Sequence, residues 1–194
     1  MVTAVLDQLR RGSLGREYMT AVASSTRVGA ILGVLWIAEI ALNNIVAPLE
    51  PARHRWDNVF FAVIALSMFV DTAIRSFRGN KLSLGIRVGS WLGLISGLVA
   101  CCAGLSLVVF GMRFLLADPY NVIEFAQRGA LEPNMATYLA FETMPGAFLH
   151  LFLVGLAMGS ILGTLGGGVG KGLRLIFDKT SGPCRTLTAF ESGT

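Results

Sequence analysis

The chain has 194 residues, of which 54% are hydrophobic and only 14% are charged, and its mean hydropathy is +0.65. Soluble domains carry about 25% charged residues, so this chain lacks the polar surface that would cover a water-soluble globule. The net charge of +4 does not indicate nucleic-acid binding, because the basic residues flank apolar segments instead of forming one patch. We therefore expect one all-α integral membrane domain in contact with the lipid bilayer, with no nucleic-acid partner.

Four apolar stretches come close to, or exceed, the roughly 20 residues that an α-helix needs to cross a bilayer. They are predicted at about 28–48, 57–74, 88–114 and 143–170. The first is interrupted by Glu39, Asn43 and Asn44, and the third is uncharged from Val88 to Met112. The sequence therefore predicts a four-helix membrane protein.

Basic residues gather in three segments that share one side if there are four spans. Lys and Arg in short loops mark the cytoplasmic or matrix-like side, so we expect both termini there, in a bacterial inner membrane or an organelle inner membrane. Only Arg53 and Arg55, between the first two spans, run against the pattern. The residues of the three segments are Arg10, Arg11, Arg16 and Arg27; Arg75, Arg78, Lys81 and Arg87; and Lys171, Arg174, Lys179 and Arg185.

The long connection between the third and fourth spans is predicted to hold short interfacial helices within residues 117–145. Asp118 and Pro119 are typical of a helix start, and Gly129 of a helix end. A second short helix is expected to begin near Pro133 and to end before Pro145. Residues 2–11 are expected to form another interfacial helix.

Glycine recurs every fourth residue in three of the predicted spans. Because four residues make just over one helical turn, each series forms a strip without side chains along one face. Such strips let helix backbones approach closely in lipid, where the hydrophobic drive for association is small. We expect them to pack helices together, although glycines could instead mark places where a helix bends or unwinds. The series are Gly29 and Gly33; Gly85, Gly89, Gly93 and Gly97; and Gly155, Gly159, Gly163 and Gly167.

Glu39 is the ionisable residue placed nearest the middle of a predicted span, and Asn43 lies one turn further on. A carboxylate at that depth costs about 2.5–3.5 kcal/mol on insertion scales. These two residues are therefore a possible ion or substrate site, with a structural hydrogen bond between helices or subunits as the alternative. We find no catalytic set, no metal-ligand spacing and no motif for a cofactor.

Two functions lead at this stage, and neither is enzymatic; an enzyme that acts on lipid comes third, because no catalytic set is visible. The first expectation is a structural or assembly subunit of a larger membrane complex, whose partners are other membrane subunits or further copies of the chain. The alternative is a small oligomeric transporter or channel that uses Glu39. Residues 27–33 (RVGAILG) resemble residues 87–93 (RVGSWLG), so a parallel internal repeat would favour the alternative, but chance similarity of helix starts explains the match equally well.

Overall fold

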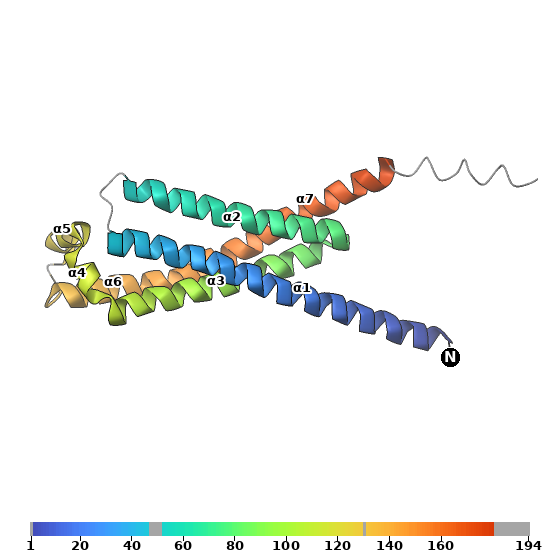
Figure 1. Ribbon diagram of the computed structural model, residues 1–194, viewed down its shortest axis with the longest axis horizontal. Helices are drawn as coiled ribbons and strands as arrows, with labels where there is room; N and C mark the ends of the chain where they lie inside the picture. The colour runs from blue at the N-terminus through green and yellow to red at the C-terminus, as the bar shows by residue number, and fades with distance from the viewer. Residues whose placement is uncertain (1, 47–51, 130, 181–194) are drawn as a thin grey trace, which may run out of the picture.

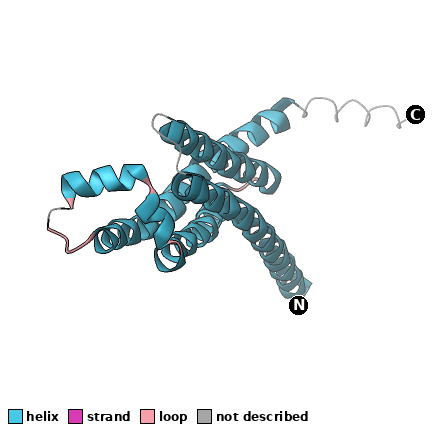
Figure 2. Ribbon diagram, turned by 60° about the vertical axis from the view of Figure 1, so that its left-hand side comes forward, coloured by secondary structure: helices cyan, strands magenta, loops and turns pink. Residues whose placement is uncertain are grey.

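The computed structural model describes residues 2–46, 52–129 and 131–180, and all regular elements in these ranges are helical. Figures 1 and 2 show long rods lying side by side, with short helices at one end. In chain order the elements are α1 (Val2–Ala41), the π-helical turn η1 (Leu42–Val46), α2 (Ala52–Gly79), α3 (Leu82–Phe110), α4 (Met112–Ala117), α5 (Pro119–Arg128), α6 (Met135–Leu149), the π-helical η2 (His150–Ala157) and α7 (Met158–Thr180).

Within the described residues, four segments are long and apolar enough to cross a membrane. They are Val22–Val46, Ala52–Gly79, Leu82–Phe110 and Met135–Thr180, and their best windows have mean hydropathies of 1.7, 1.7, 2.3 and 1.9. The predicted all-α class with four membrane-length helices is confirmed, and it fits a multi-pass membrane protein. The last segment has 46 residues, or about 70 Å of helix at 1.5 Å per residue. It is therefore far longer than the ~30 Å hydrocarbon core of a bilayer.

Helix α3 is the central rod, because it contacts α1, α2, α6, η2 and α7. Helices α1 and α3 run in one direction, and α2 and α7 run in the other (Figure 1). The start of α1 and the end of α7 consequently lie at the same end of the bundle, whereas α4 and α5 lie at the opposite end. One buried cluster between the rods is formed by Leu32, Trp36, Ile64, Met68 and Ala100.

The glycines of α3 face those of η2 and α7 in an antiparallel register. No side chain separates the two backbones there, so we call this contact the glycine seam. A Cβ added at Gly85, Gly89, Gly93 or Gly97 would lie 2.6, 2.5, 3.0 or 2.9 Å from the Cα atom of Gly167, Gly163, Gly159 or Gly155, respectively.

Two further close approaches use other glycines. On α1, a Cβ at Gly29 would lie 3.0 Å from Ile95 Cβ, and one at Gly33 would lie 2.6 Å from Val99 Cβ. On a second face of α7, a Cβ at Gly166 would lie 2.6 Å from the carbonyl oxygen of Phe69 in α2. Real Cβ contacts are rarely so short, so at each of these positions only hydrogen fits without movement of a neighbour.

Three helix boundaries differ from the sequence-based prediction. The chain continues from Val2 as one helix, so residues 2–11 are not a separate element. Helix α3 ends at Phe110, short of the predicted 114, because Gly111 takes a non-helical ψ of 7° and its N–H bonds to Leu107 O. Helix α6 runs through Pro145 to Leu149, so the prediction that it would end before Pro145 is wrong. Proline removes one backbone donor and crowds the preceding turn, and the helix widens into η2 one turn later, a known accommodation.

The predicted helix after Asp118 is confirmed. Helix α5 begins at Pro119 and ends before Gly129, and the Asp118 side chain accepts from the Tyr120 N–H at 3.0 Å. This bond satisfies one of the free N–H groups at the helix start. That α5 lies at a membrane interface stays a prediction.

Candidate functional site

The candidate site lies where the end of the first membrane-length segment meets the start of α2. Asn43 Nδ2 donates to Glu39 Oε1 at 2.6 Å, as the spacing of one helical turn allows. Asn43 is buried, with 8% of its surface exposed, and Glu39 is partly exposed. Within Val22–Val46, Glu39 falls in the final third. It therefore lies nearer the carboxyl end of the segment than the middle position predicted from the sequence.

The helix widens at this point into the π-helical turn η1. Asn44 Nδ2 donates to the carbonyl of Ile40 at 2.8 Å. The side chain thus competes for a carbonyl that a backbone N–H bonds in a regular α-helix. The carbonyl of Asn43 accepts a hydrogen bond from Arg53 Nη2 of α2. Single π-helical turns are frequent at functional sites, because they redirect backbone and side-chain groups.

Asp57 of α2 brings a second carboxylate to Glu39. Asn43 Nδ2 donates to Asp57 Oδ1 as well as to Glu39 Oε1, so the two carboxyl groups share one amide donor. On its other side, Asp57 Oδ2 lies 4.0 Å from Nδ1 of the exposed His54. One amide group therefore holds two acidic side chains from different helices.

Arg53 joins this cluster to the short helices at the end of the bundle. Its Nη2 lies 2.5 Å from Asp118 Oδ2, and the two side chains are only 12% and 3% exposed. The guanidinium also stacks over the Tyr120 ring, 5.0 Å from the ring centre. Arg53 was an exception to the predicted charge pattern, and its pairing with Asp118 explains how that charge is held.

A cavity of about 200 Å³ opens beside the cluster, between the end of the first membrane-length segment, α3, α6 and η2. Its polar wall is formed by Glu39, Asn43, Asn44, Thr143 and His150, and its apolar wall includes Ile40, Ala100, Leu107 and Ala147. Asn43 Oδ1 is buried without a hydrogen-bond partner. The cavity thus combines a carboxyl group with an apolar surface, and the unpartnered Asn43 oxygen lies closed off beside it.

His150 is fixed at the start of η2 by two contacts. Its Nδ1 lies 3.1 Å from the carbonyl oxygen of Gly146, and its ring meets Trp36 edge to face, with the centroids 5.2 Å apart. A carbonyl only accepts, so Nδ1 carries the hydrogen, and Nε2 of the neutral ring is then an acceptor. The sequence had placed His150 at the interface, without a role in the site.

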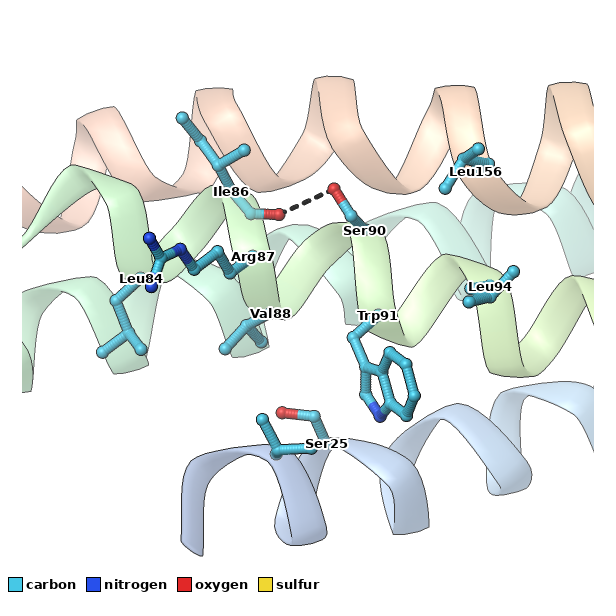
Figure 3. Close-up of a pocket in the computed structure, with 10 residues that line it drawn as sticks. Ser25, Leu84, Ile86, Arg87, Val88, Ser90, Trp91, Leu94 and Leu156 are labelled. Carbon is cyan, nitrogen blue, oxygen red and sulfur yellow. Dashed lines mark hydrogen bonds between the residues drawn. The ribbon is translucent and has the colours of Figure 1, made fainter. Parts of the chain in front are cut away.

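A larger cavity of about 470 Å³ lies along α3 (Figure 3). It is nearer the end of the bundle where α1 starts and α7 ends. Its wall is mainly apolar, with Trp91 and Val88 facing α1 and Leu156 contributed by η2. Ser90, on this wall, donates to the carbonyl of Ile86 within α3. The carboxylates lie instead at the smaller cavity, which is therefore the better candidate for an ion or substrate site.

Among the described residues, no group of three or more His, Cys, Asp or Glu side chains is placed to hold a metal ion. No family model, curated protein or solved structure matches this chain. By length and composition, the four membrane-length helices of the described residues are compatible with a multi-pass membrane protein.

Proposed function

We propose that this chain is a non-catalytic membrane protein that translocates a small cation, with Glu39 as its intramembrane carboxylate. The observation that carries the proposal is the cavity beside Glu39, Asn43 and His150, which lies between the end of the first membrane-length segment, α3 and η2. Ionisable residues within membrane segments are costly and commonly mark ion or substrate pathways. Asn43 donates to both acidic side chains, which holds Glu39 and Asp57 together beside this cavity.

The test is flux through the full chain reconstituted in liposomes. Glu39→Gln removes the charge and keeps the shape of the side chain, so we expect loss of cation flux with unchanged helix content and elution volume. Glu124→Gln is the matched control, because Glu124 lies on α5, outside the candidate site, where it pairs with Arg128. Equal flux in the wild type and the Glu39→Gln variant would refute the role of Glu39.

We propose that both termini lie on the cytoplasmic or matrix-like side of the membrane and that α4 and α5 lie at the opposite interface. The basic residues at the end that holds the start of α1 and the end of α7 support this orientation. The glycine seam, in this view, is what holds α3 and α7 together in lipid. Close backbone approach gains dispersion contacts there and does not depend on the hydrophobic effect.

A second candidate is a structural or assembly subunit of a larger membrane complex. Gly168 and Gly172 of α7 lie outside the glycine seam, and a Cβ added at either would meet nothing within 4 Å. They are flanked by exposed apolar side chains such as Leu165, Val169 and Leu173. Native mass measurement after gentle solubilisation separates the candidates: stable association with unlike subunits favours this one, and a defined homo-oligomer or monomer favours the translocating protein.

A further inference from the structure

The acidic group on the wall of the smaller cavity is Glu39. Arg53 and Asp118 neutralise each other at 2.5 Å, whereas Glu39 shares the Asn43 amide with Asp57. Asp57 is 41% exposed, and its second oxygen lies 4.0 Å from His54 Nδ1. A carboxylate on the wall of a cavity favours a cationic ligand.

The polar wall of the cavity offers acceptors. Glu39 supplies carboxylate oxygens, and His150 supplies Nε2, because its Nδ1 donates to the Gly146 carbonyl. Asn43 Oδ1 has no partner, but the atom is closed off from the cavity. A ligand with several N–H donors and no acceptor would satisfy Glu39 and His150 together.

The remaining wall is apolar. Ile40, Ala100, Leu107 and Ala147 surround a space of about 200 Å³, larger than one water molecule needs. An alkali ion gains nothing from such a surface, whereas a short hydrocarbon group gains from each CH₂ that it buries there. The wall thus favours an organic cation over an inorganic one.

We infer that this cavity binds a small primary ammonium compound, with the charged –NH₃⁺ group against Glu39 and His150 Nε2 and a short alkyl chain against the apolar wall. An ammonium group has three donors and no acceptor, so it suits a wall that offers carboxylate oxygens and a ring nitrogen. Asp57, which shares the Asn43 amide with Glu39, adds a second acidic group to the site. Binding of the ammonium compound does not depend on translocation. Only the movement of the cation after it binds rests on the proposed function.

The test is binding to the purified full chain in lipid nanodiscs, measured as the thermal shift and by calorimetry with propylammonium chloride as the probe. We expect saturable stabilisation by propylammonium and none by sodium chloride or tetramethylammonium chloride at equal ionic strength. The uncharged analogue 1-propanol should also have no effect. Equal stabilisation by sodium or tetramethylammonium, or no shift with propylammonium, would overturn the inference.

Two variants connect the binding to this cavity. Glu39→Gln should weaken propylammonium binding by about ten- to hundredfold, as expected for the loss of one charge-assisted hydrogen bond, and Glu124→Gln should not. Gly146→Leu adds a side chain at the cavity wall where a Cβ meets nothing within 4 Å, so it should fold and still weaken binding. Unchanged affinity in whichever of the two variants folds would overturn the inference.

The binding experiment and the flux experiment can refute the ligand site and the translocation proposal independently. Propylammonium binding without any cation flux would refute translocation and leave the ligand site standing. Flux of alkali cations that depends on Glu39, without propylammonium binding, would refute the ligand class and leave translocation standing.

Discussion

Substitution of Gly89 by alanine tests the glycine seam directly. The added Cβ would lie 2.5 Å from Gly163 Cα and equally close to the backbone of that turn. This is at least 1 Å short of the ~3.5–4.0 Å at which two carbon atoms attract most strongly. The obstacle is backbone, so no flexible side chain can give way, and α3 and α7 must move apart.

The control is the same substitution at Gly168, which lies on α7 with nothing within 4 Å of the added Cβ. Both variants gain the same helix propensity, up to about 1 kcal/mol in water, so that contribution cancels in their difference. The difference is then the overpacking cost, typically about 1–3 kcal/mol. We expect Gly89→Ala to be the less stable of the two by that amount.

The assay is reversible unfolding of the two purified variants in mixed micelles with increasing sodium dodecyl sulfate, followed by loss of ellipticity. A difference below about 0.5 kcal/mol, the usual range for substitutions that touch nothing, would refute the reasoning. It would mean that α3 and α7 do not meet at Gly89 in the protein as it exists in lipid-like surroundings.

Three other changes have expected outcomes. Arg53→Gln should destabilise the chain by about 3–5 kcal/mol, because it leaves a buried Asp118 unpaired, and hydrogen exchange should rise in α5. Arg128→Gln, which removes a side chain that is 69% exposed, should cost at most about 1 kcal/mol. In detergent, with Cys184 replaced by serine, maleimide should modify the exposed Cys102 before the buried Cys101; the reverse order would mean that α3 is rotated. Reporter domains fused to the two termini should report the same side of the membrane, and opposite sides would contradict an even number of spans.

Much of the fold follows from local patterns. Long apolar runs predict membrane-length helices because lipid offers no partners for an open backbone. The start of α5 follows from Asp118 and Pro119, whose side-chain oxygen and fixed φ suit the first turn of a helix. Pro145 misled the prediction, because the same residue ends a helix in one setting and is accommodated inside a membrane-length helix in another.

Only part of the candidate site could be predicted from the sequence. Glu39 and Asn43 are one turn apart, so their hydrogen bond follows from helix geometry. Asp57 reaches the same amide from another helix, and Arg53 reaches Asp118 across 65 residues. No local pattern encodes such distances, although the anomalous position of Arg53 in the charge pattern was a signal.

By itself the sequence determined which residues share a helical face. An α-helix turns by a constant angle at each residue, so the spacing of two residues in the sequence sets whether their side chains point the same way. It therefore determined that the glycines at intervals of four form strips and that Glu39 accompanies Asn43. Only the tertiary structure decided that Gly89 lies opposite Gly163 and that Asp57 joins Glu39 beside a cavity. Those pairings depend on how whole rods are set against one another, and that is fixed by the sum of many distant contacts along their length.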